Sequence, residues 1–182
     1  TPGSLELQKT FYEMAKEKMD FVVMEVSSQS LKYNRVLGTY FDIGVFTNFY
    51  KDHISLKEHN DMDDYFNSKL KLFSMCKKAY ANADDFKTSM IINKSKKCEF
   101  KTYGIDNTCD LLAKDVTITN VCVDYKVKIG DKNERIKVNI PGRFSVYNSL
   151  AAIAVCTEFG ATVEHIKETL EHIAVPGRSE LV

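Results

Sequence analysis

The stretch that decides the fold is Phe41-Asp42-Ile43-Gly44-Val45-Phe46-Thr47-Asn48, in which six mostly apolar residues are followed by two polar ones. A short apolar run of this kind is typical of a parallel strand that is buried on both faces. Phe21-Val22-Val23-Met24 has the same pattern, and we expect a second buried strand there. Apolar positions at helical spacing precede it in residues 4–18. The order helix, strand, connection, strand predicts an α/β fold with a doubly wound, mostly parallel sheet.

Polar residues follow both predicted strands. Glu25, Ser27 and Ser28 come after the first strand, and Thr47 and Asn48 come after the second. Because ligands of open α/β sheets bind outside the carboxyl ends of the strands, we expect the functional site at this edge.

The clearest helical pattern covers residues 61–80, and Lys69 stands inside its apolar stripe. An ammonium group there is costly to bury, so something must neutralise it or pair with it. A buried salt bridge or a lysine stem that reaches solvent at the edge of the stripe would also explain this position.

The pattern changes to alternating strands in residues 97–138, with a hairpin turn signal at Gly130-Asp131-Lys132-Asn133. We expect a small antiparallel extension at the edge of the main sheet. Helices are predicted over residues 147–159 and 162–173, and Pro176-Gly177 resembles an interdomain hinge.

Composition narrows the class of protein. The 182 residues are 44% hydrophobic and 27% charged, with 25 basic and 25 acidic side chains, which indicates one globular domain and argues against a nucleic-acid binder. No apolar run approaches the roughly 20 residues of a membrane span, and no export signal opens the sequence, so we expect a cytoplasmic location. The five cysteines contain no closely spaced pair, which argues against structural zinc and favours reduced thiols.

Six motifs stand in the order in which they occur in the Mur ligases, with most similarity to the muramyl-tripeptide synthetase branch. They are Met24-Glu25-Val26-Ser27-Ser28-Gln29, Val45-Phe46-Thr47-Asn48 followed by Asp52-His53, Tyr65-Phe66-Asn67-Ser68-Lys69, Asn82-Ala83-Asp84-Asp85, Pro141-Gly142-Arg143-Phe144-Ser145-Val146-Tyr147-Asn148 and Val175-Pro176-Gly177-Arg178. The resemblance implies the central, ATP-binding domain of an amide ligase. Such a ligase adds an amino acid to a UDP-N-acetylmuramyl-peptide through an acyl phosphate, in peptidoglycan precursor synthesis.

The resemblance also implies roles for individual residues. Glu25, His53 and a carbamylated Lys69 would hold Mg²⁺ and form the catalytic group. Residues that match the contacts to the UDP-muramyl substrate are Thr1, Ser27 and Arg35. Residues that match the nucleotide side are Asn82, Asp84, Asp85, Asn148 and Arg178.

The sequence departs from the family pattern in several places. Ser145 stands where the family often has Asn, and two additional residues near His59 place a second histidine that could compete as a metal ligand. No Gly-x-x-Gly-Lys-[Ser/Thr] loop for the ATP phosphates occurs. We therefore expect residues 1–175 to be part of a central domain, with 176–182 as the hinge and the start of a C-terminal domain. The N- and C-terminal domains of a longer chain would be its partners, and the chain alone would be inactive.

Three alternatives stay open. Another ligase of the same superfamily, such as a folylpolyglutamate synthetase, is disfavoured by the paired Ser27-Ser28. A zinc-ribbon relative that amidates lipid-linked precursors is disfavoured by the absence of cysteine pairs. A non-catalytic binding or scaffold module of the same fold is the alternative from another functional class.

Overall fold

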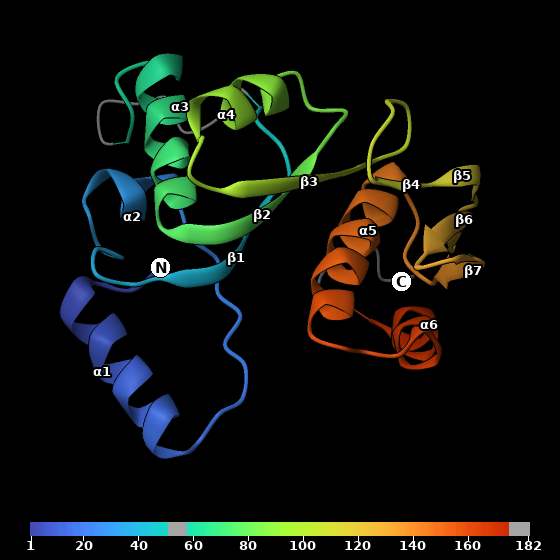
Figure 1. Cartoon of the computed structure of the whole chain (residues 1–182), viewed down its shortest axis with the longest axis horizontal. Helices are drawn as coiled ribbons and strands as arrows, with labels where there is room; N and C mark the ends of the chain where they lie inside the picture. Colours follow the sequence, from blue (N-terminus) through green and yellow to red (C-terminus); the bar gives the residue numbers. More distant parts are fainter. Residues whose placement is uncertain (51–57, 175–182) are drawn as a thin grey trace.

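The computed structural model describes residues 1–50 and 58–174, and its main sheet has four parallel strands in the order β1-β2-β3-β4 (Figure 1). The bounds are β1 Phe41–Phe46, β2 Cys76–Asn82, β3 Glu99–Gly104 and β4 Leu111–Leu112. The register between β1 and β2 runs from Phe41 opposite Cys76 to Phe46 opposite Ala81. The prediction of a parallel strand at Phe41–Phe46 is confirmed.

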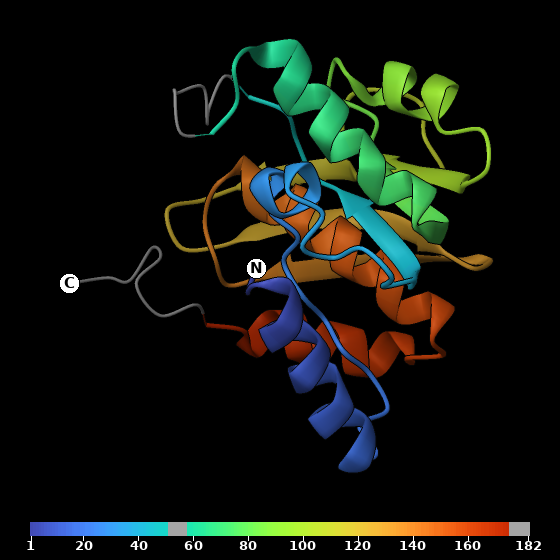
Figure 2. The same cartoon turned by 90° about the vertical axis from the view of Figure 1, so that its left-hand side faces the viewer.

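Helices cover both faces of this sheet (Figures 1 and 2). Helices α3 (Met62–Leu70) and α4 (Thr88–Lys94) lie on one face, and α5 (Arg143–Glu158) lies on the other. Side chains of β2 alternate accordingly, because Ala79 and Ala81 belong to the core on the α3 side and Tyr80 belongs to the core around α5. The predicted doubly wound α/β architecture is confirmed. The remaining helices are α1 (Ser4–Lys16), α2 (Ser28–Lys32), the 3-10 turn Lys71–Ser74 and α6 (Val163–His172).

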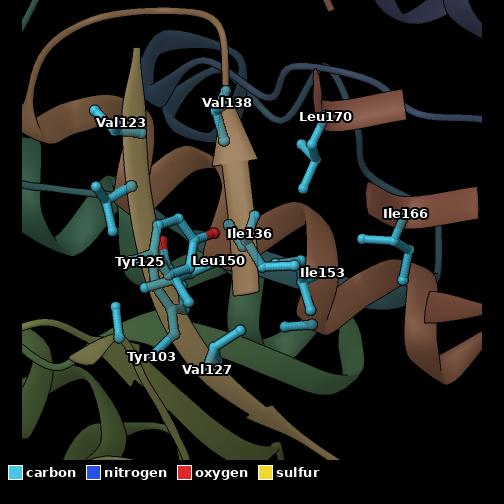
Figure 3. Packing of buried hydrophobic residues seen from close by; sticks show 14 of the residues in the cluster. Tyr103, Val123, Tyr125, Val127, Ile136, Val138, Leu150, Ile153, Ile166 and Leu170 are labelled. Atoms are coloured by element: carbon cyan, nitrogen blue, oxygen red, sulfur yellow. The ribbon is translucent and has the colours of Figure 1, made fainter. Parts of the chain in front are cut away.

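The antiparallel strands form a second sheet, with β5 (Lys114–Ile118), β6 (Val123–Ile129) and β7 (Lys132–Val138) in that order. The predicted hairpin turn is confirmed, and Gly130 adopts a φ of +59° there. Tyr103 of the main sheet, Tyr125 of β6 and Leu150 of α5 meet in one buried core, so α5 lies between the two sheets (Figure 3). The antiparallel part is therefore a separate sheet across α5, and Glu99–Gly104, which we expected within it, joins the parallel sheet instead.

The prediction of a buried strand at Phe21–Met24 is wrong. These residues form no strand, and the side chain of Val23 is 95% exposed. The ring of Phe21 packs against the ring of Phe159, the residue that follows α5, with 5.0 Å between the two centroids. An apolar run becomes a strand only where a neighbouring strand accepts its hydrogen bonds, and no strand of residues 1–50 and 58–174 pairs with this one.

The prediction of one helix over residues 61–80 is also too long. Helix α3 ends at Leu70, the 3-10 turn follows, and strand β2 begins at Cys76. The stripe continues through Phe73 and Cys76 because both side chains enter the same core from different elements. The helices predicted over 147–159 and 162–173 are confirmed, although α5 begins four residues earlier, at Arg143.

Over the part of the chain that the structure describes, every helix is too short or too polar to cross a membrane.

Candidate functional site at the carboxyl ends of the parallel strands

The carboxyl ends of β1 and β2 are joined by side-chain hydrogen bonds. The Asn82 amide donates to the carbonyl of Thr47 at 3.0 Å, and the Asp85 carboxylate accepts from the backbone N–H of Phe49 at 2.6 Å. The hydroxyl of Thr88 on α4 donates to the carbonyl of Asn82. Two residues of the predicted nucleotide side thus fix the segment that leaves β1.

Lys69 reaches this edge from the last turn of α3. Its ammonium lies 5.1 Å from the ring centroid of Tyr65, and that ring stacks on Phe49 at 4.7 Å between centroids. Burial lowers the pKa of Lys69, while the negative charges of Asp85 and Glu25 act in the opposite direction. Within residues 1–50 and 58–174 no carboxylate pairs with the ammonium, so a buried salt bridge does not explain this lysine there.

Hydrogen bonds bring together Thr1, Ser27 and Arg35. The Thr1 hydroxyl donates to the carbonyl of Glu25 at 2.8 Å and accepts from the backbone N–H of Ser27 at 3.0 Å. The guanidinium of Arg35 donates to the Thr1 carbonyl at 3.4 Å. Ser27 also caps α2, because its hydroxyl accepts from the N–H of Ser30 at 3.2 Å. The three residues predicted to contact the acid substrate therefore form one group beside the exposed side chain of Glu25.

Helix α5 is bonded to Asp84 and also carries Asn148. The carboxylate of Asp84 accepts from the hydroxyl of Tyr147 at 2.9 Å, and Asn148 follows on the same helix with an exposed side chain. Ser145, which stands where the family often has Asn, is buried, and its hydroxyl donates to the carbonyl of Pro141 at 3.0 Å. This side chain thus stabilises the entry to α5.

A buried pair beside the site was not predicted. His59 and Ser28 are both buried, and Nε2 of His59 lies 2.8 Å from the Ser28 hydroxyl. The His59 ring also lies 5.1 Å from that of Tyr65. His59 therefore belongs to the packing between α2 and α3. Nothing in a single sequence links two residues 31 positions apart, so only their polar chemistry could have indicated the pair.

Two predicted residues, His53 and Arg178, lie outside the described residues, as does the predicted hinge at Pro176-Gly177. Among the residues that the structure does describe, no three His, Cys, Asp or Glu side chains gather as a metal-binding group. Glu25 offers an exposed carboxylate whose negative charge acts on Lys69, and carboxylate oxygens are ligands that Mg²⁺ prefers. A carbamate on Lys69 would add a second oxygen ligand, so the residues fit the implied cation in their chemistry. All five cysteines are free thiols, as predicted.

An α/β domain with a polar edge of this kind belongs to the class of proteins that bind ligands at the carboxyl ends of parallel strands. Residues 1–156 match the family model of the Mur ligase middle domain. The chain belongs to the Mur ligase family.

Relatives match over the whole chain. The UDP-N-acetylmuramoyl-L-alanyl-D-glutamate--2,6-diaminopimelate ligase of Caldanaerobacter subterraneus subsp. tengcongensis is 46% identical over 183 residues, which cover 100% of this chain and 37% of that protein. The protein of the same name from Clostridium botulinum is 40% identical with the same coverage. A solved structure of a ligase of that name superposes with a TM-score of 0.87 at 25% identity, over 98% of this chain and 38% of that one. The chain thus spans 37% of the length of these two relatives.

Proposed function

We propose that this chain is the part of an ATP-dependent amide ligase that holds the acyl-transfer centre, and that its parent protein adds an amino acid to a UDP-N-acetylmuramyl-peptide. The observation that carries the proposal is the half-buried Lys69 ammonium at the carboxyl edge of the sheet, over the Tyr65 ring that stacks on Phe49, whose backbone N–H donates to Asp85. The relatives' names supply the substrate class. Peptidoglycan precursor synthesis in the cytoplasm is the setting we expect.

The reaction joins a carboxylate to an amine. A carboxylate oxygen of the substrate attacks the γ-phosphorus of ATP and ADP leaves, which gives an acyl phosphate. The amine of the incoming amino acid then attacks the acyl carbon, and phosphate leaves with the bond electrons while the nitrogen loses a proton. The first step brings two negatively charged groups together, and the second develops negative charge on the acyl oxygen and the leaving phosphate, so positioning and charge neutralisation provide most of the catalysis.

Lys69, Glu25 and His53 are the residues that we propose for the metal and the catalytic centre. The Lys69 ammonium first loses a proton, and the neutral amine then joins carbon dioxide and loses a second proton, so that carbamylation converts a half-buried cation into an anion. Mg²⁺ bound there would reduce the repulsion between the substrate carboxylate and the phosphates. The ring of Tyr65 beneath the Lys69 side chain keeps it directed at this edge.

The hydrogen-bonded group of Thr1, Ser27 and Arg35 supports their proposed role toward the acid substrate. The Arg35 guanidinium suits a carboxylate or phosphate of that substrate. On the nucleotide side we propose the residues implied by the family motifs, which are Asn82, Asp84, Asp85, Asn148 and Arg178. ATP binding by the parent protein further requires a phosphate-binding loop, which we expect in another part of a longer chain, together with the domains on either side.

The test is ATP-dependent ligation by the full-length protein that contains this chain, with a UDP-N-acetylmuramyl-dipeptide and a panel of amino acids. We expect amide product and stoichiometric ADP. The variant Lys69→Ala should lose at least about 10²-fold in rate, the scale of removing one charge-stabilising group, and added short carboxylic acids should restore part of it. Ligation that is insensitive to this substitution would contradict the proposed role of Lys69. No ligation with any of the amino acids would favour a non-catalytic module.

A further inference from the structure

One carboxylate near the site is surrounded by a loop. Oδ2 of Asp84 accepts from the backbone N–H groups of Ile105 and Asp106 at 2.7 and 3.0 Å, and Oδ1 accepts from that of Asn107 at 2.8 Å. These are three successive residues in the loop after β3, and the Asn107 side chain adds a fourth donor at 3.0 Å. The loop thus wraps around Asp84.

The same carboxylate also binds α5. The Tyr147 hydroxyl donates to Oδ2 of Asp84 at 2.9 Å, which is the fifth donor to a group with about four lone-pair directions. A Cβ atom at Gly104 would lie 3.1 Å from Oδ2, so the backbone approaches closely on that side as well. The oxygens of Asp84 have little capacity left for a ligand.

A second connection runs parallel to the first. The Arg143 guanidinium donates to the Asp106 carboxylate at 2.5 Å and lies 5.8 Å from the ring centroid of Tyr147. The loop after β3 is therefore attached to the first turns of α5 at two points. Asn148, the residue proposed for the adenine, directly follows Tyr147. The two attachments therefore fix the position of the helical turn that carries it.

We propose that Asp84 is a positioning residue, which fixes loop 105–107 and the first turns of α5 so that Asn148 faces the nucleotide, and does not itself contact the nucleotide. This inference rests on the proposed function for the identity of the ligand, and it narrows the nucleotide-side role proposed there for Asp84 to one of positioning. The attachment itself rests only on the contacts of Asp84.

The charge of Asp84 fits this role. Burial raises the pKa of its carboxyl, but the three backbone N–H donors and the Tyr147 hydroxyl lower it by more, so the pKa lies below the ordinary value. The group is an anion at neutral pH, and hydrogen bonds to an anion are stronger than those between neutral groups.

The first test is hydrogen exchange on the full-length protein. In Asp84→Asn the amides of residues 105–107 should exchange about 10- to 100-fold faster, because each loses a hydrogen bond to a charged acceptor. The control is Asp110→Asn, which should leave the exchange of residues 105–107 unchanged. Asp110 lies near the same loop but accepts from the N–H and hydroxyl of Thr102, at 2.7 and 2.8 Å. Unchanged exchange in Asp84→Asn would overturn the proposal, and this holds whether or not the protein ligates.

The second test is a double-mutant cycle on ligation. Asp84→Asn and Tyr147→Phe should each raise KM for ATP by about 5- to 20-fold with kcat within about twofold, and the double variant should be no worse than Asp84→Asn alone. Tyr147→Phe removes only a hydroxyl, so it serves if Asp84→Asn folds poorly. Multiplicative effects would show that Asp84 acts independently of Tyr147, and they would overturn the positioning role. Absent ligation in the wild type would instead contradict the proposed function, while the exchange result would still stand.

Discussion

Lys69 and Lys78 are two lysines of the same α/β layer in opposite electrostatic environments. Lys78, near the beginning of β2, pairs with the Glu158 carboxylate at 2.7 Å, and this hydrogen bond raises its pKa. Lys69, beside the carboxyl ends of the strands, lies over the Tyr65 ring, and burial lowers its pKa. Both side chains are partly buried, but only Lys78 has a partner carboxylate within the described residues.

The surroundings of Glu158 extend this contrast. Its carboxylate accepts from Lys78, from the Tyr80 hydroxyl at 2.5 Å and from Lys101 at 3.2 Å, so the charges near the beginning of β2 satisfy one another. At the carboxyl edge Lys69 has no partner carboxylate among the described residues, so its charge stays available for a reaction centre.

The largest effect should come from the aromatic support of Lys69. Phe49 is fully buried, between the Tyr65 ring and that of Phe66. Phe49→Ala should lower the free energy of unfolding of the chain by about 3–5 kcal/mol, measured by chemical denaturation. The matched control is Phe86→Ala, because Phe86 is 72% exposed, and its cost should stay below about 1 kcal/mol. Equal costs would show that Phe49 is not a core residue.

The next effect concerns Glu158. Glu158→Ala should cost about 1–3 kcal/mol at neutral pH, because it leaves the Tyr80 hydroxyl and the Lys78 ammonium without their shared acceptor. Urea denaturation at pH 7 measures this cost. Thr157→Ala removes a neighbouring side chain that bonds only within α5, and it should cost less. A cost below that of Thr157→Ala would contradict the role of Glu158.

The stability contribution of Glu158 should depend on pH in a defined direction. The hydrogen bonds from Lys78 and Tyr80 lower its pKa to about 2 from an ordinary 4.5. A depressed pKa in the folded state contributes stability that is fully present above about 4.5 and is lost as the pH falls through about 2. The difference in unfolding free energy between the chain and Glu158→Gln should therefore shrink between these two values, and a constant difference would exclude the shift.

The smallest effects should differ in sign between the two lysines. Lys78→Met should lower the free energy of unfolding slightly, because it removes an ion pair. Lys69→Met should leave it unchanged or raise it by up to about 1 kcal/mol, because an apolar side chain replaces a partly buried ammonium. Paired denaturation curves measure both. A greater loss of stability in Lys69→Met would mean that the ammonium has a structural partner.

Sequence reasoning predicted the strand at Phe41–Phe46 and the helix that carries Lys69, because local pattern and final burial agree at both places. Phe21–Met24 has the same apolar pattern as Phe41–Phe46, yet it stays exposed, since pattern alone does not supply a neighbouring strand. Strand β2 was missed because Phe73 and Cys76 continue the apolar stripe of the preceding helix, although Cys76 already belongs to the strand.

The candidate site shows the same division. The family resemblance pointed to Thr1, Ser27 and Arg35 together, and the structure joins these residues by hydrogen bonds. The Ser28 and His59 pair could not be predicted, because it depends on how α2 meets α3. A motif thus indicates which residues belong to a site, whereas the roles of their side chains follow from contacts that only the fold creates.

The central claim is that Lys69, at the carboxyl edge of the sheet, takes part in the reaction, whereas Lys78 contributes only to the stability of the fold. The direct measurement is the ATP-dependent ligation rate of the full-length protein with Lys69→Met and with Lys78→Met, both assayed at a temperature at which the two variants are folded. The account predicts a loss of at least about 10²-fold for Lys69→Met and a change within about twofold for Lys78→Met. Equal losses, or a greater loss for Lys78→Met, would contradict it.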